Sequence, residues 1–153
     1  MTDHSVVITS ATQNFIAKLG LPAEVTVATQ YDSTNDLYQI LLTTTDPALL
    51  IGFHGETLSS IQLILGQHLH AQLGEWLNLS LNVNDYRERR ESAINTLIQN
   101  TVTQVLSTKQ PHVLPPMPAS ERRLVHMYLA DHPQVSTASD GVGRSRSVVI
   151  SPK

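Results

Sequence analysis

Cysteine is absent from the 153 residues of this chain, and several other common signals are missing with it. Without a thiol there is no disulfide framework, no thiolate zinc ligand and no cysteine nucleophile. No apolar stretch approaches the ~20 residues that cross a bilayer, and the N-terminus lacks the basic-then-apolar pattern of a signal peptide. We therefore expect a cytoplasmic protein without membrane insertion.

Catalytic signatures are also missing. The sequence has no phosphate-loop lysine motif, no Gly-x-Ser-x-Gly elbow and no His-Glu-x-x-His helix. The closest histidine pair is His68 and His70, but residues two apart on a helix point in different directions, and no nearby carboxylate completes a ligand set. The sequence therefore predicts no enzyme, no metal site and no cofactor.

Positive charge is scarce in the first half of the chain. Up to Val83 a single base, Lys18, stands against seven acids, a balance of −6. From Asn84 onward nine bases stand against six acids, a balance of +3. The apolar fraction of 41% is ordinary for globular proteins. A length of 153 residues is enough for one mid-sized domain or two small modules. The change of sign favours two modules with different roles.

Apolar periodicity predicts the elements of the first half. Gly20 and Pro22 are expected to end the first helix, and Asp46 is expected to cap a short helix with Pro47 at its first position. The expected elements are a helix at 12–19, strands at 24–30 and 37–43, a short helix from 46, a long helix at 56–72 and a strand at 77–83. The long helix carries an apolar stripe, with the last two residues widening it: Leu58, Ile61, Leu65, Leu69, Leu63 and Ile64.

The second half predicts two more helices and a closing hairpin. The helices are expected at 85–108 and 120–130, the proline-rich segment 111–118 is expected to be extended with at most an edge strand, and the hairpin strands are expected at 134–138 and 144–150. In the last helix the expected buried residues are Leu124, Val125, Tyr128 and Leu129. Arg122 and His126 stand four apart, so they should face the same way on another side.

Gly52-Phe53-His54-Gly55 separates the short helix from the long one. Glycines allow the backbone to approach a ligand closely, and the free N–H groups at the start of the next helix favour an anion such as phosphate. A Gly-x-x-Gly loop between two apolar helices is typical of a KH domain, which holds about four single-stranded nucleotides. The order of the predicted elements around this loop is that of the type II KH fold. An ordinary helical corner is the alternative. Phe53 is expected either to stack on a base or to pack inward, and His54 adds charge only when protonated.

Four further segments resemble the Jag (SpoIIIJ-associated) family of bacterial proteins. They are Val83–Glu91, Pro116-Met117, Glu121–His126 and Arg144–Ile150, and the third holds the Arg-x-x-x-His pair of the R-three-H domain. That family fuses a type II KH domain to an R-three-H domain. The resemblance covers about 12–150 and implies an α+β fold, with a KH domain at 1–83 whose three-stranded sheet has its helices on one face, and a small α/β R-three-H domain at 84–153.

The resemblance also implies a function. It predicts binding of single-stranded RNA, with single-stranded DNA as an alternative ligand, in post-transcriptional or RNA-chaperone-like regulation. The implied contact residues are Gly52, Phe53, His54, Gly55, Arg122, Arg123, His126, Arg144 and Arg146, the last two on one face of the final strand. The acidic first half leaves a second interpretation open: a protein-interaction module that forms a homodimer or heterodimer, with only minor RNA contact.

Three features depart from the family pattern. Family members often carry an additional N-terminal domain, which this sequence does not show. The loop holds Phe53-His54 where a lysine or arginine is usual, and Pro118 stands where a serine would cap the Arg122 helix.

Overall fold

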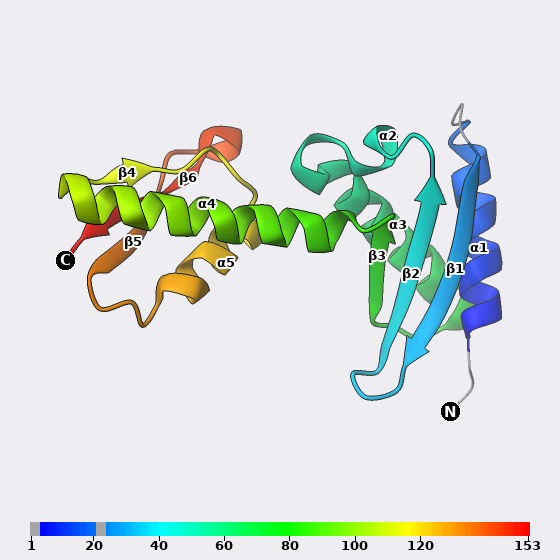
Figure 1. The fold of residues 1–153 in the computed structure, drawn as a ribbon. Coiled ribbons are helices and arrows are strands. Elements are labelled where there is room, and N and C mark those ends of the chain that lie inside the picture. The colour runs from blue at the N-terminus through cyan, green and yellow to red at the C-terminus, as the bar shows by residue number, and fades with distance from the viewer. Residues whose placement is uncertain (1–3, 21–23) are drawn as a thin grey trace. The chain divides into compact units, whose positions relative to one another are not determined.

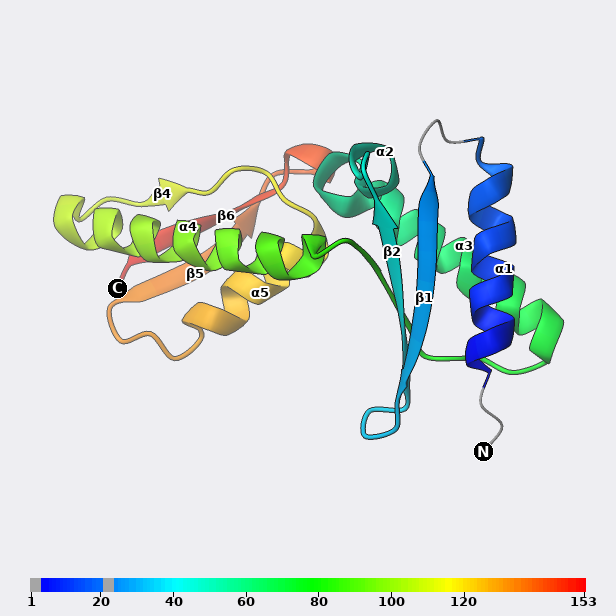
Figure 2. The same ribbon diagram turned by 45° about the vertical axis from the view of Figure 1, so that its right-hand side comes forward.

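The computed structural model describes residues 4–20 and 24–153, and it consists of two compact units, Met1–Arg87 and Glu88–Lys153 (Figures 1 and 2). We call them unit 1 and unit 2. The predicted helix stop at Pro22 lies outside the described residues. Both units combine helices with a sheet, so the α+β class is confirmed.

Unit 1 has the predicted order of elements. They are α1 (Ser5–Lys18), β1 (Val25–Asp32), β2 (Leu37–Thr44), α2 (Ala48–Ile51), the 3₁₀ turn η1 (Phe53–Gly55), α3 (Glu56–Leu73) and β3 (Leu79–Val83). The sheet order is β1-β2-β3, with β1 and β2 antiparallel and β2 and β3 parallel. The helices α1 and α3 lie along one face of this sheet (Figures 1 and 2).

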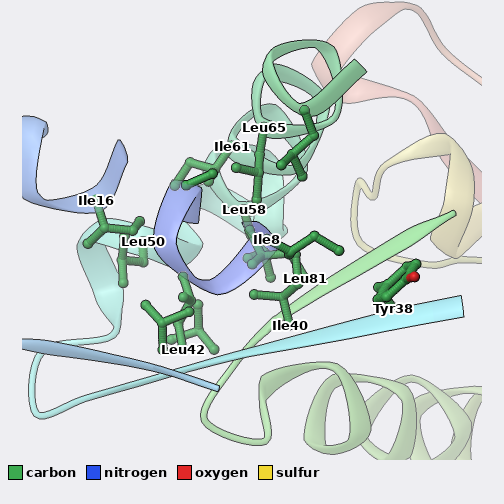
Figure 3. Packing of buried hydrophobic residues seen from close by; sticks show 14 residues of the cluster. Ile8, Ile16, Tyr38, Ile40, Leu42, Leu50, Leu58, Ile61, Leu65 and Leu81 are labelled. Atoms are coloured by element: carbon green, nitrogen blue, oxygen red, sulfur yellow. The ribbon is translucent and has the colours of Figure 1, made fainter. Parts of the chain in front are cut away.

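The core of unit 1 lies between these helices and the sheet (Figure 3). Alternate residues of β2 point inward, because successive side chains of a strand face opposite sides: Tyr38, Ile40 and Leu42 are buried. From α3 the stripe predicted from the sequence is buried, namely Leu58, Ile61, Leu65 and Leu69. Leu63 and Ile64 do not widen it, since they are 63% and 49% exposed. At 100° per residue both point away from the stripe, and α3 covers the sheet with one side only.

Two predicted helix starts are wrong. The first helix begins at Ser5, seven residues before the predicted start, because Ile8 and Ala11 extend its buried side. In α2 the N-cap position is taken by Pro47, and no side chain caps the helix. Asp46 therefore does not act as the predicted cap; its own N–H donates to Thr44 Oγ1 at 3.3 Å.

The segment Ala48–Leu73 is long and apolar enough to cross a membrane by length and composition alone, contrary to the expectation from the sequence. The chain is not one continuous helix there, because Gly52 has φ 69° and ψ −166° and His54 has φ 50°. In addition, one apolar stripe of α3 is buried in the core of unit 1. The segment is thus weak evidence for a membrane span.

Unit 2 packs two helices against a second sheet. The elements are α4 (Tyr86–Thr108), which begins in the last residues of unit 1, then β4 (His112–Val113), α5 (Ala119–Leu129), β5 (Val135–Asp140), the 3₁₀ turn η2 (Gly143–Ser145) and β6 (Ser147–Pro152). The sheet order is β4-β6-β5, and both pairings are antiparallel. The predicted extended segment with an edge strand is confirmed.

The buried side of α5 differs from the prediction. Val125 and Leu129 are buried as expected, but Leu124 and Tyr128 are 39% and 51% exposed. The third buried residue is Glu121, whose carboxylate accepts hydrogen bonds from Arg90 Nε at 2.8 Å and Nη2 at 2.9 Å. Glu121 can occupy a core position because Arg90 forms two hydrogen bonds with its carboxylate. A prediction based only on apolar residues therefore placed Leu124 and Tyr128 on the buried side instead.

Candidate nucleic-acid interface

Both glycines of the Gly52–Gly55 loop have backbone conformations that favour glycine, with φ of 69° and 81°. A Cβ at Gly52 would collide with the side chain of Thr57. A Cβ at Gly55 would lie 3.2 Å from Cε1 of Tyr86, and Gly55 is buried. The loop is thus closely packed against its own unit, a reason for two glycines that is independent of any ligand.

The two variable residues of the loop are Phe53, whose side chain is exposed, and His54, whose backbone is in the left-handed region. Phe53 is 61% exposed, so the alternative in which it packs inward is wrong. Its ring meets the His54 ring edge to face, with centroids 4.2 Å apart and an interplanar angle of 83°. His54 has φ 50° and ψ 30°, a left-handed conformation that is uncommon outside glycine. The exposed Phe53 ring is available for stacking.

The start of α3 offers backbone N–H groups, and the Gly52–Gly55 loop before it contains no lysine or arginine. Its N-cap is Gly55, and no side chain caps the helix. The positive end of a helix dipole favours an anion, but the first turn already carries Glu56. The loop itself can therefore offer a phosphate backbone N–H groups but no lysine or arginine side chain.

In unit 2, Arg122 and His126 face the same way, as predicted, and both reach β5. His126 Nδ1 lies 2.7 Å from Thr137 Oγ1, and its Nε2 lies 2.8 Å from Ser139 Oγ. Arg122 Nη1 donates to the same Ser139 Oγ at 3.5 Å. A neutral imidazole donates at one nitrogen and accepts at the other, and hydroxyl groups fit either arrangement. The pair is therefore part of a polar link between α5 and β5.

Met117 brings Arg122 near the loop that joins the last two strands. Its carbonyl oxygen accepts from Arg122 Nε at 3.3 Å, and its N–H donates to the carbonyl of Arg146 at 3.2 Å. Arg144 lies two residues before Arg146, and Arg123 follows Arg122 on α5. The side chains of Arg123, Arg144 and Arg146 are exposed. Met117 thus links the Arg122 side chain to the backbone at Arg146, and Arg123 and Arg144 are close to these two in sequence.

The prediction that Arg144 and Arg146 alternate on one face of a strand is wrong. The strand begins only at Ser147, and both arginines lie in the turn before it. This turn is closed by backbone bonds from Ser145 to Val142 at 3.3 Å and from Arg146 to Gly143 at 3.2 Å. The two arginines are therefore held by a compact turn instead of a pleated edge.

Sequence reasoning missed the partners of these residues. Thr137 and Ser139 alternate along β5, so they would have been found by asking which hydroxyls face the Arg-x-x-x-His pair. The Arg90–Glu121 pair joins residues 31 apart and left no local signal. Within residues 4–20 and 24–153, no group of three histidine or carboxylate side chains could hold a metal ion.

Comparison with known proteins finds one matching domain family and several relatives that share one name. Residues 92–152 match the family model of the R-three-H domain. Relatives named RNA-binding protein KhpB are 34% identical over 135 residues in Lactiplantibacillus plantarum (88% of this chain, 41% of that protein) and 33% over 129 in Clostridium symbiosum (84% and 58%). In Bacillus subtilis the KhpB protein is 38% identical over 109 residues (69% and 52%). The chain thus spans about half the length of the curated relatives it matches.

Proposed function

This chain belongs to the Jag family, with an R-three-H domain in its second half, and from that premise we propose that it is a cytoplasmic single-stranded RNA-binding protein. The observation that carries the proposal is the link through Met117 between Arg122 and Arg146, with the exposed Arg123 and Arg144 close to them in sequence. We place the principal RNA contact on these four arginines, which we call the arginine cluster. Regulation after transcription, or assistance to RNA folding, is the corresponding role.

Charge supports this choice of surface. Phosphate contacts supply most of the affinity for nucleic acid, and a guanidinium can hold a phosphate through two hydrogen bonds. Unit 2 has eight bases against five acids, a balance of +3, whereas unit 1 has two against eight, a balance of −6. Glu121, the acid nearest in sequence to the cluster, is already paired with Arg90. The cluster is therefore the most favourable place for a phosphate.

We assign unit 1 as a type II KH domain with a secondary part in RNA binding. Its element order and its Gly52–Gly55 loop support the assignment. The loop supplies backbone N–H groups and the exposed ring of Phe53, and a base stacked on an aromatic ring is a sequence-tolerant contact. Single-stranded DNA fits the same contacts, so the preference for RNA is a matter for competition experiments.

The direct test is the binding of a fluorescein-labelled, mixed-sequence, single-stranded RNA at low salt. The double variant Arg123→Gln/Arg146→Gln should bind at least about tenfold more weakly, which corresponds to ~1.4 kcal/mol. The matched control is Lys109→Gln/Lys153→Gln, which removes the same charge from elsewhere in unit 2. Equal losses in the two double variants would mean that only net charge matters. No binding by the wild type would reject the proposal.

A second candidate function is self-association through unit 1. The exposed apolar residues Val6 on α1 and Leu63 and Ile64 on α3 favour it. Apart from histidines, each of these helices contains a single charged residue, Lys18 in α1 and Glu56 in α3. A groove of about 690 Å³ lies between α1 and α3. A concentration-dependent mass in light scattering that Ile64→Glu abolishes would support a homodimer, and a constant monomer mass would reject it.

A further inference from the structure

The segment Val83–Glu91 is the longest of those that resemble the family, yet the first residues of α4 within it are engaged in unit 1 instead of the arginine cluster. Tyr86 packs against the core of unit 1 and places its ring beside Gly55. A Cβ on Gly55 would lie 3.2 Å from Cε1, 3.4 Å from the hydroxyl oxygen and 3.7 Å from Cζ of this ring. The glycine loop therefore rests directly on the start of α4.

Asn84 fixes the turn that leads into α4. Its φ is 50°, and its N–H donates to the carbonyl of Leu42 at 2.7 Å. Its side chain accepts from the N–H of Thr44 and donates to the carbonyl of Thr44, both at 3.1 Å. Asn84 thus ties the end of β3 to the end of β2, the strand that leads to α2 and the loop, and this sets the position of Tyr86.

Arg87 fixes the same turn from the other side. Its Nε donates to the carbonyl of Leu81 at 2.7 Å, and its Nη2 donates to Gln62 Oε1 at 2.9 Å. The same Gln62 oxygen accepts from the N–H of Leu81 at 2.9 Å. The N–H of Arg87 donates to Asn82 Oδ1 at 3.2 Å. This guanidinium therefore joins α4 to β3 and α3, the helix that begins at the glycine loop.

We propose that Tyr86 is a positioning residue for the Gly52–Gly55 loop, with Asn84 and Arg87 fixing the turn that carries it. Its ring holds the loop in one conformation, so that the N–H groups and the Phe53 ring are presented to a nucleotide without a further cost of ordering. Thr57 supports the loop beside Gly52, and Tyr86 supports it beside Gly55. The role in RNA binding rests on the proposed function, whereas the effect on the loop does not.

The test compares three variants of the full chain. Tyr86→Ala removes the ring, and Tyr86→Phe keeps it. Tyr31→Ala is the matched control, because Tyr31 packs partly buried on the same core but at the other end of β2, opposite Tyr38. Each variant is examined by amide hydrogen exchange and by titration of the same fluorescent single-stranded RNA.

The informative amides are those at the two ends of the loop. The N–H of Gly52 donates to the carbonyl of Ala48 at 2.9 Å, and the N–H of Glu56 donates to the carbonyl of Phe53. In Tyr86→Ala both should exchange about tenfold faster while Leu65 and Leu69 in the middle of α3 change little, and RNA affinity should fall about threefold. Tyr86→Phe should restore both readings, and Tyr31→Ala should leave both near the wild-type values.

Three results would overturn the inference. One is unchanged exchange at Gly52 and Glu56 in Tyr86→Ala. Another is an equal increase throughout unit 1, which would make Tyr86 an ordinary core residue. The third is faster exchange at Gly52 and Glu56 in Tyr86→Ala with unchanged RNA affinity, which would mean that holding the loop in place does not contribute to RNA binding. If the wild type fails to bind the RNA, the proposed function is rejected, while the exchange rates still decide whether Tyr86 holds the loop.

Discussion

Arg122 and His126, the Arg-x-x-x-His pair, have a structural role besides their predicted role in RNA binding. His126 joins α5 to β5 through hydroxyl groups at 2.7 Å and 2.8 Å, and Arg122 shares one of these hydroxyls. These side chains therefore hold the unit together, in addition to any contact with phosphate. Loss of RNA binding in an Arg122 or His126 variant therefore has to be separated from loss of folding, and the exposed Arg123 and Arg146 are cleaner probes.

His126→Ala should lower the free energy of unfolding by about 2 kcal/mol, because two partly buried hydrogen bonds are lost and two hydroxyls lose a partner. Chemical denaturation measures this change. His112→Ala is the control, since the hydrogen bond of that ring to Thr108 is exposed, and its effect should be well below 1 kcal/mol. Equal effects would show that His126 is not structural.

Tyr31 provides a prediction for high pH. Its hydroxyl donates to Asp36 Oδ1 at 2.7 Å, and this hydrogen bond is the main reason why its pKa is raised from 10.0 to about 12. A raised pKa in the folded state means that the contribution to stability is present below pH 10 and is lost as the pH rises toward 12. Phenolate absorbance should show a late component that is absent in Tyr31→Phe and shifted to lower pH in Asp36→Asn. A late part of the titration curve that Tyr31→Phe leaves unchanged would contradict this.

The same hairpin turn predicts an opposite effect at low pH. Hydrogen bonds from the Asn35 side chain and from the N–H of Thr34 hold the pKa of Asp32 below its usual 3.8. A lowered pKa means that the stabilisation is present above pH 3.8 and is lost as the pH falls below it.

At the scale of elements, the sequence predicted where helices and strands occur better than which way they face. The order of unit 1 follows from apolar periodicity and from the two glycines of the loop. Orientation failed where neighbours decide it: Ile64 is exposed because α3 covers the sheet with one side only, and Tyr128 is exposed because the Arg90–Glu121 pair occupies the buried side of α5. A partner 31 residues away cannot be inferred from local spacing.

The glycine loop gives a prediction at this scale. Phe53→Ala should weaken RNA binding about fivefold, near 1 kcal/mol, because a base loses its aromatic platform. The melting temperature should hardly change, since Phe53 is 61% exposed. Phe53→Tyr keeps an aromatic face and should bind like the wild type. An unchanged affinity in Phe53→Ala would mean that the loop is a helical corner without a role in binding.

At the scale of the whole molecule, the charge is divided between the units, with −6 in unit 1 and +3 in unit 2. The sequence predicted this change of sign, because net charge follows from counting residues. The sequence did not predict that Arg122 and Arg146 are linked, since this depends on Met117 contacting both and on a turn where a strand was expected.

The arginine cluster offers few bases to phosphates, so the salt dependence of RNA binding should be shallow. At roughly 0.7 per phosphate for single strands, the four arginines of the cluster give a log–log slope of about −3. Titrations over a series of salt concentrations measure the slope. A value beyond about −6 would require a much larger basic surface than the arginine cluster.

The most direct test of the central claim, that the arginine cluster carries most of the affinity, is one comparison. The same fluorescent single-stranded RNA is titrated against Arg123→Gln/Arg146→Gln and against the loop variant Phe53→Asp/His54→Asp. The affinity lost in the arginine variant should exceed that lost in the loop variant, because four of the ten lysines and arginines lie in the cluster and none lies in the loop. A larger loss in the loop variant would contradict the account and make unit 1 the principal RNA-binding site.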